Sequence, residues 1–356
     1  MGGLFVHNAE NNATTQAAAL GLSVSTSVYG LTVPIIFGAT RVPGNMIWYG
    51  DFTAKPQYTQ VSTGKGGGGN QSTQTGYAYT ASFMLGIGEG PIVGINAVWN
   101  DGVLDTTDVF SIFTGGAAQT AWGYLTTLDP TKALPYRNLA YIAAAKYDLG
   151  SSASLPQLTF EVYGKGYGTS IAGIPDVDPG FIITEIMTNP RYSAGFPAAN
   201  IGTWTSYKAY CIANGFLFSP AYDSAKSAAS IITDLLALTN SEAYFSEGLL
   251  KITPYGDTSI TANGYTYTAN ITPIYELGDD AFVDTGSADP VLIERGSQAD
   301  AYNQIDIECL AACRTNDKET GHKQVLGLSF YVHFSSRKPY QAHSTPNKPQ
   351  LAALYS

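Results

Sequence analysis

The chain is poor in charged residues and in cysteine. Only 13% of its 356 residues are charged, whereas an average soluble domain carries about 25%, so ionised groups solvate little of its surface. Three cysteines, Cys211, Cys309 and Cys313, are too few for a disulfide framework and indicate a cytosolic folding compartment. A composition of this kind is typical of proteins that hide surface in assemblies.

Long apolar runs are also missing from the sequence. No stretch reaches the roughly 18 apolar residues of a membrane helix, and the N-terminal region lacks the basic start and apolar core of a signal peptide. Neither a membrane span nor secretion through a signal peptide is therefore predicted. The net charge of -10 and the pI near 4.8 argue against specific nucleic-acid binding, which depends on clustered Lys and Arg.

Glycine, tyrosine and apolar residues are abundant instead. The chain has 38 Gly, 24 Tyr and 44% apolar residues, which predicts short strands joined by tight turns. The apolar segments 31–38 and 45–50 predict a hairpin around the breaker Arg41-Val-Pro-Gly44. Residues 64–70 predict a flexible glycine-rich loop, and the alternation over 76–85 predicts a strand with one buried face.

A second hairpin is predicted where the strand 91–99 meets Asn100-Asp-Gly102, because these turn residues tolerate left-handed backbone angles. The strand 155–163 closes the first β-rich unit. Beyond residue 173 the apolar spacing becomes helical, with Asp178 as N-cap and Asn189-Pro190 as the end of a first helix. Two more helices are predicted at about 204–214 and around 231–238. They are followed by strands at 243–245 and 249–252 on either side of a Glu247-Gly248 turn, and by a later strand at 301–310.

Enzymatic motifs are weak in this chain. Gly64-Lys-Gly66 lacks the spacing of a nucleotide-binding loop, and Gly86–Gly90 is followed by Pro91 where a dinucleotide motif needs a helix. Glu89 could cap backbone N–H groups, or it could pair with Asp101 or Glu161 in a glycosidase-style arrangement. A Ser-His-Asp site is poorly supported, because His7 is the only histidine before residue 322.

Metal and sugar sites are also weakly supported. Cys309 and Cys313 with His322 lack the fourth ligand and the paired spacing of a zinc site. No metal or cofactor is therefore predicted. Six aromatic residues could form a sugar-stacking platform, but such residues more often fill β-rich cores and subunit interfaces: Trp204, Tyr207, Tyr210, Tyr244, Tyr265 and Tyr267.

Several segments, taken in order, resemble the hub proteins of long non-contractile phage tails and gene transfer agents. The resemblance begins in Val33–Gly38, Arg41–Gly44 and Ile47-Trp48, continues through Tyr77–Tyr79 and Gly88–Ile92, and extends to Leu249–Gly256 and Ala301–Asn303. The motif residues are assigned structural roles, with no catalytic, cofactor-binding or metal-binding residue among them: Pro34, Gly38, Trp48, Glu89, Gly90, Pro91, Trp99, Tyr136, Arg137, Pro156 and Glu161.

The resemblance implies a tail-tip or baseplate hub in the virion, assembled in the bacterial host cytoplasm. The implied fold is α+β, mainly β, with two β-barrel-like hub domains and an inserted helical segment. The implied partners are further copies of the chain in a homotrimer, the ring of distal tail protein and other tail-tip proteins, with the host surface contacted indirectly. DNA would leave through the central channel, where an acidic lumen would not retain it.

Four regions are expected along the chain. Residues 1–22 form an N-terminal arm, 23–165 the first β-rich hub domain, and 175–308 the second hub domain with helices at about 178–240. Residues 309–356 form an atypical basic tail. Its last 46 residues carry six Lys or Arg against two acidic residues, so we expect this tail to pack poorly. Because hub proteins continue for several hundred residues, the tail also predicts truncation or a shifted reading frame.

The leading hypothesis is therefore a structural, non-enzymatic tail-tip hub. Two alternatives stay open at the level of sequence. One is a cell-wall glycan hydrolase carried by a phage tail, and the other is a carbohydrate-binding module.

Overall fold

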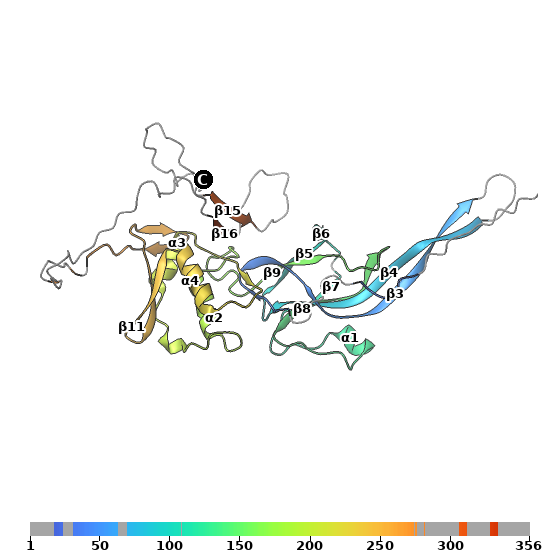
Figure 1. Cartoon of the computed structure of the whole chain (residues 1–356), viewed down its shortest axis with the longest axis horizontal. Coiled ribbons are helices and arrows are strands. Elements are labelled where there is room, and N and C mark those ends of the chain that lie inside the picture. Colours follow the sequence, from blue (N-terminus) through green and yellow to red (C-terminus); the bar gives the residue numbers. More distant parts are fainter. Residues whose placement is uncertain are drawn as a thin grey trace, which may run out of the picture. The chain divides into compact units, whose positions relative to one another are not determined.

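The computed structural model of the chain describes residues 18–23, 31–62, 70–107, 109–273, 275, 281, 306–311 and 328–333. They belong to two compact units, of which the first extends to Ala269. The second unit contains β15 (Asp306–Ala311) and β16 (Leu328–His333), which pair antiparallel. Strands outnumber helices among the described elements (Figure 1), so the predicted α+β, mainly β class is confirmed.

The first four-stranded sheet has the order β2-β9-β5-β6 and is antiparallel throughout. It is formed by β2 (Ala39–Pro43), β9 (Leu158–Tyr163), β5 (Gly94–Asn100) and β6 (Val103–Asp105). Asp101 and Gly102 join β5 to β6 with φ angles of 47° and 83°, the left-handed pair that a tight two-residue hairpin needs. The hairpin predicted at Asn100-Asp-Gly102 is confirmed.

The second four-stranded sheet has the order β3-β4-β8-β7. It is formed by β3 (Asn45–Ser62), β4 (Asn70–Glu89), β8 (Leu139–Gly150) and β7 (Phe110–Phe113). β3 pairs with β4, whereas the preceding β1 (Ile35–Ile36) pairs with β10 (Ala221–Tyr222). The hairpin predicted between segments 31–38 and 45–50 is therefore wrong. Its supposed turn, Arg41–Pro43, is part of β2 at the edge of the first sheet, where proline costs no ladder bond.

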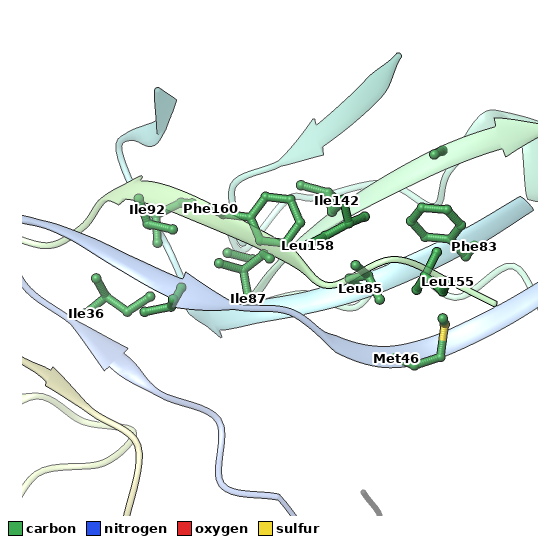
Figure 2. Close-up of a cluster of buried hydrophobic side chains, with 14 of the residues drawn as sticks. Ile36, Met46, Phe83, Leu85, Ile87, Ile92, Ile142, Leu155, Leu158 and Phe160 are labelled. Atoms are coloured by element: carbon green, nitrogen blue, oxygen red, sulfur yellow. The ribbon is translucent and has the colours of Figure 1, made fainter. Parts of the chain in front are cut away.

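The two sheets share one hydrophobic core. β4 contributes Phe83, Leu85 and Ile87, β8 contributes Ile142, and β9 contributes Phe160, all at most 1% exposed. Figure 2 shows these side chains lying between the strands of the two sheets. Burying each large apolar side chain contributes about 1.5–3 kcal/mol, so this layer holds the sheets together. None of the sheets in the described residues closes into a barrel.

The middle of β4 is buried on both faces. Phe83 and Leu85 point into the shared core, while Met84 packs in a second cluster with Trp122, Leu125 and Tyr141. Helix α1 (Gly123–Leu128) supplies Leu125 to that cluster. The prediction of one buried face for 76–85 is therefore wrong, because α1 and its flanking loops cover the side that alternation alone assigns to solvent.

The hydroxyl of Tyr141 gives the first testable prediction. Its ring is fully buried and stacks on Phe113 with centroids 4.3 Å apart, but its oxygen has no hydrogen-bond partner. Tyr141→Phe is expected to leave the free energy of unfolding unchanged or raise it by up to about 1 kcal/mol, because it removes an unsatisfied buried polar group. Denaturant titration measures this change.

Tyr207 is the matched control for that substitution. It is also fully buried, but its hydroxyl hydrogen-bonds Thr239 Oγ1 at 3.1 Å. Tyr207→Phe is expected to cost about 1 kcal/mol. Equal losses for both variants would contradict the difference between the two hydroxyls.

Three helices follow the sheets within the first unit: α2 (Pro179–Thr188), α3 (Thr205–Ala213) and α4 (Ala228–Leu238). Asp178 caps α2 by accepting a hydrogen bond from the Phe181 N–H at 3.1 Å, and Asn189 ends it. All three predicted helices are confirmed. A 3₁₀ turn, η1 (Ala198–Asn200), lies between α2 and α3.

Two short hairpins complete this unit. β11 (Ser241–Ser246) pairs with β12 (Leu249–Pro254), and β13 (Ile260–Ala262) pairs with β14 (Tyr265–Tyr267). Glu247 and Gly248 form the predicted turn between β11 and β12, with φ angles of 56° and 77°. The predicted loop 64–70 lies almost wholly outside the described residues, as does the basic tail apart from Cys309–Ala311 of β15 and the strand β16.

Candidate functional site: the junction of the sheets with the helices

The first motif residues lie where the sheets meet the helical segment. Gly38 has a φ of +58°, and a Cβ placed there would collide with Ser219 Oγ. That hydroxyl accepts a hydrogen bond from the Ala39 N–H at 3.1 Å and donates one to Asp176 at 2.5 Å. Pro34 accepts a hydrogen bond from the Glu89 N–H at 2.8 Å through its carbonyl. Gly38 and Pro34 therefore have structural positions at the junction.

Glu89 ends β4 and pairs with Arg191, which follows α2. The Arg191 Nε donates to one carboxylate oxygen, and its Nη2 lies 3.3 Å from the other. The Glu89 side chain is only 13% exposed, whereas the Arg191 side chain is 48% exposed. The hydrogen bond to Glu89 raises the pKa of Arg191 above its ordinary value. Glu89 thus links the second sheet to the helical segment by a two-point ion pair.

A second polar cluster lies beside this pair. Glu185 of α2 accepts hydrogen bonds from Tyr192 Oη at 2.5 Å and Asn189 Nδ2 at 2.7 Å, and it lies 3.5 Å from Lys165 Nζ. The Lys165 ammonium is also 5.5 Å from the centre of the Tyr192 ring. Burial raises the pKa of Tyr192, and its hydrogen bond to Glu185 raises it further. Tyr192 is therefore a fixed hydrogen-bond donor and not a proton carrier near neutral pH.

Apolar contacts complete the junction. Phe37 is fully buried and meets the rings of Phe181 and Tyr222 edge-on, with centroids 6.5 and 6.1 Å apart. Its N–H donates to the Pro220 carbonyl at 3.0 Å. The segment of β1 and Phe37 therefore attaches the sheets to the helices through backbone pairing and packing together.

The motif residues Gly90 and Pro91 form a tight crossing at the end of β4. Gly90 lies against Gly115, and a Cβ on Gly90 would meet the Gly115 Cα and carbonyl oxygen at 2.5 Å. The peptide bond between Gly90 and Pro91 is cis. Tyr136 packs edge-on against Tyr141 with centroids 5.7 Å apart, and Arg137 is exposed.

Trp99 and Glu161 lie on neighbouring strands of the first sheet. The Arg41 guanidinium lies 4.2 Å from the centre of the Trp99 ring, and its Nε donates to Thr159 Oγ1 at 2.7 Å. Glu161 is 5% exposed and accepts a hydrogen bond from Asn96 Nδ2 at 2.6 Å. Both motif residues are therefore held in contacts within the sheet.

The last two motif residues are partly buried. Trp48 on β3 meets Trp122 edge-on at 6.2 Å, and Pro156 precedes β9. Pro156 also lines a surface hollow with Asp101 and Asp148.

The three carboxylates of the glycosidase hypothesis have separate partners. Glu89 pairs with Arg191, Asp101 accepts a hydrogen bond from the Gln157 N–H at 2.9 Å, and Glu161 accepts from Asn96. Asp101 and Glu161 also line different hollows of the surface. The structure brings no two of them to one shared cleft within the described residues.

The hypothetical sugar platform is mostly core. Tyr207, Tyr210 and Tyr267 are at most 8% exposed, and Trp204 Nε1 donates to the Leu250 carbonyl at 3.0 Å. Of the six aromatic residues, Tyr244 is the only one whose side chain is largely exposed, at 45%. The packing interpretation of these rings therefore holds for most of them.

The residues of the predicted metal hypothesis lie partly outside the described part of the chain. The described part of the chain holds no group of three or more His, Cys, Asp or Glu side chains that could bind a metal ion. Cys313 and His322 lie outside the described residues. Cys211 is buried, and burial raises the pKa of its thiol well above the ordinary value. Among the described helices, none combines the length and apolar character needed to cross a membrane.

Sequence reasoning missed Gln119. Its Oε1 accepts a hydrogen bond from the Gly115 N–H at 2.7 Å, and its Nε2 donates to the carbonyls of Pro135, Tyr136 and Leu139 at 2.9–3.1 Å. One side chain therefore ties together the segment that meets Gly90 and the motif segment at Tyr136. No pattern around Gln119 predicts this role, because its partners lie up to 20 residues away.

Gln119→Leu is expected to lower the free energy of unfolding by about 2–4 kcal/mol, because it leaves partly buried backbone groups without partners. Gln157→Leu is the control, since that side chain is exposed, and a change within about 0.5 kcal/mol is expected there. Urea titration followed by tryptophan fluorescence measures both. Equal midpoints for the two variants would contradict the bracing role.

The described residues thus form a mainly β structure in which the motif residues are held in packing and hydrogen-bond contacts. Residues 227–314 match the model of a family described as "Putative phage tail protein". The predicted resemblance to phage tail proteins is therefore confirmed, and a structural role in a phage tail is what this match supports. The matched range includes the motif segments Leu249–Gly256 and Ala301–Asn303.

A comparison with solved structures gives a further likeness. A chain of the "Virion of native gene transfer agent (GTA) particle" aligns with 19% identity and a TM-score of 0.41, over 68% of this chain and 56% of that chain. The chain thus spans little more than half the length of that protein. A search of curated proteins found no match.

Proposed function

We propose that the chain is the hub of a phage-type tail tip, which connects the tail tube to the host-attachment apparatus. It would assemble as a homotrimer around the tail axis, stack on a ring of distal tail protein and bind other tail-tip proteins. The observation that carries this proposal is the phage tail family match over residues 227–314, combined with the resemblance of earlier motifs to hub proteins. Tail-tip position, trimer and partners are all parts of the proposal.

The architecture suits a scaffold. In the proposed arrangement, residues 23–165 form the first hub domain, whose two open sheets on one core give a barrel-like unit. Residues 175–308 form the second hub domain, and 309–356 a basic tail. Low surface charge favours large contacts between subunits, and carboxylates facing the channel would let DNA pass.

The proposed role needs no enzymatic activity. Each of the three carboxylates has a structural partner. Glu89 pairs with Arg191, Glu161 accepts a hydrogen bond from Asn96, and Asp101 accepts one from the Gln157 N–H. A glycosidase needs two carboxyl groups about 5–10 Å apart across one substrate cleft. The separate hydrogen bonds of these residues favour a bracing role.

The mass of the purified native protein tests the hub directly. A trimer that binds the distal tail protein and is inert to bacterial cell wall is expected. A stable monomer that hydrolyses cell-wall glycan, with hydrolysis abolished by Glu89→Gln, would contradict the proposal.

Glu89→Gln is expected to act on stability. The amide keeps the shape of the carboxylate but loses one charge-assisted acceptor for Arg191, which is expected to cost about 1–2 kcal/mol. Glu247→Gln is the control, because Glu247 is 80% exposed in its pair with Lys251, and the expected change is below about 0.5 kcal/mol. Thermal unfolding of the two variants side by side measures this, and an unchanged Tm for Glu89→Gln would rule out the brace.

A further inference from the structure

The long hairpin of β3 and β4 continues beyond the sheet as a two-stranded arm. We define the arm as Lys55–Ser62 of β3 and Asn70–Ala78 of β4, which pair with each other. β8, the other neighbour of β4, ends at Gly150 opposite Tyr79. Figure 1 shows β3 and β4 extending past the remaining strands of the unit.

A free ribbon of this kind is poorly stabilised. A two-stranded hairpin alone is at best marginally stable in water, and both of its edges offer unpaired N–H and C=O groups. Residues 55–60 are all exposed, with Tyr58 at 61%. The arm therefore gains stability only from a surface that pairs with an edge and covers a face.

The charge of the arm differs from that of the whole chain. The arm has one lysine, Lys55, and no acidic residue, whereas the chain carries a net charge of -10. The remaining arm residues are mainly Thr, Gln, Ser and Gly. One positive charge is too few for a nucleic-acid site, and the polar composition does not favour a membrane. A protein surface with acidic groups and a free strand edge fits this chemistry best.

The chain itself presents such a surface. A hollow of about 790 Å³ is lined by β6, by the segment that leads to β7 and by the end of β8, and a second hollow of about 450 Å³ shares Asn100, Asp148 and Leu149 with it. Asp101, Asp105 and Asp148 line the two hollows, against one lysine, Lys146.

The edge strand β6 borders the same hollow, and β7 follows directly after Val109 on its lining. β6 and β7 are the terminal strands of their two sheets. Val103 on β6 is 71% exposed, and Val109 before β7 is 45% exposed. The hollow therefore offers a backbone edge, apolar contacts and negative charge in one place.

The far end of the arm lies away from the hollow of its own chain. The arm leaves the sheet at Tyr79, opposite Gly150 at the rim of the hollow, and runs outward for about 9 residues, or about 30 Å at the rise of an extended strand. A second copy of the chain removes this separation, because its hollow can lie where the arm ends.

We propose that the arm of one copy docks in the Asp105–Asp148 hollow of a second copy, adding a strand to the β6 or β7 edge. Backbone pairing supplies affinity, as in other strand-addition interfaces, and Lys55 with the acidic hollow orients the arm. This inference rests on the self-assembly that belongs to the proposed hub, and it names the contact between copies.

Cross-linking between two single-cysteine variants tests the contact. Tyr58→Cys and Val103→Cys are each made in the full chain with Cys309→Ser and Cys313→Ser, mixed, and treated with a short bismaleimide; Cys211 is buried and stays. A covalent dimer is expected in the mixture. The control mixture pairs Tyr58→Cys with Leu128→Cys, which is 47% exposed on α1, and little dimer is expected from it.

A charge reversal provides the second measurement. Lys55→Glu is expected to weaken self-association about tenfold, whereas Lys132→Glu, 64% exposed in the α1 region, is expected to leave it unchanged. Analytical ultracentrifugation measures both. If the wild-type chain self-associates but Lys55→Glu has no effect and both mixtures cross-link equally, the arm contact is wrong and the hub proposal stands. If the wild-type chain is monomeric, self-assembly itself is wrong, and binding to the distal tail protein then tests the hub separately.

Discussion

Gly90→Ala is expected to lower the free energy of unfolding by more than about 4 kcal/mol, because a single added methyl group would collide with backbone. The added Cβ would lie 2.5 Å from both the Cα and the carbonyl oxygen of Gly115. Since these are backbone atoms, no side chain can rotate away. Gly115 is itself fixed, because its N–H donates to Gln119 and its φ is +82°.

The backbone around Gly90 is also held in place by hydrogen bonds. The Gly90 N–H donates to the Asn138 carbonyl at 2.8 Å, and the preceding Glu89 pairs with Leu139 in the β4–β8 ladder. Relief of the clash would therefore break sheet hydrogen bonds, each costing about 1 kcal/mol or more when its groups stay buried.

Gly94→Ala is the matched control for Gly90→Ala. Gly94 begins β5, four residues further on, and a Cβ there meets no atom within 4 Å. The free energy of unfolding of the Gly94→Ala variant is expected to stay the same or to rise by about 0.5–1 kcal/mol, since alanine lowers the entropy of the unfolded chain. Urea titration of both variants measures the difference. Equal unfolding midpoints would show that the Gly90–Gly115 approach does not constrain the fold.

Local features of the fold could be predicted from the sequence. The cap at Asp178 and the turns at Asn100-Asp-Gly102 and Glu247-Gly248 each depend on a few adjacent residues. Backbone angles and side-chain capping determine such features, and both are properties of the residue types themselves. Helices and hairpins that depend on them therefore lie where the sequence predicts them.

Partners distant in sequence could not be predicted in this way. β1 pairs with β10 and β2 with β9, across more than a hundred residues. Neither short strand has a periodicity that selects its partner, so adjacency in sequence wrongly favours a hairpin. The second buried face of β4 is of the same kind, because α1 covers it from a separate segment.

For the motif residues too, the sequence shows the residue type but not the groups that the residue contacts. The glycines at 88 and 90 are visible in the sequence, but the reason for glycine is the approach of other backbone. Gly115 lies against Gly90, and the Pro34 carbonyl oxygen would lie 2.9 Å from a Cβ at Gly88. Glu89 is visible as a carboxylate, but its partner Arg191 is 102 residues away. Sequence could name these residues as important without naming what they contact.

Phe37→Ala is expected to cost about 3–5 kcal/mol, because it deletes a fully buried ring and leaves a cavity. The ring lies between Phe181 of α2 and Tyr222 of β10. Its loss weakens the contact between the sheets and the helices and leaves the core between the two sheets intact. We therefore expect the variant to lose cooperativity as well as stability.

Hydrogen exchange measured by mass spectrometry tests this coupling. In the wild-type chain, peptides from β8 and from α2 are expected to exchange with similar protection, since one unit contains both. In Phe37→Ala, α2 peptides are expected to exchange faster while β8 peptides keep most of their protection. Phe245→Ala is the control, because Phe245 is 66% exposed and both regions are expected to stay protected. Uniform loss of protection in β8 and α2 would mean that Phe37 stabilises the whole unit and is not specific to the junction.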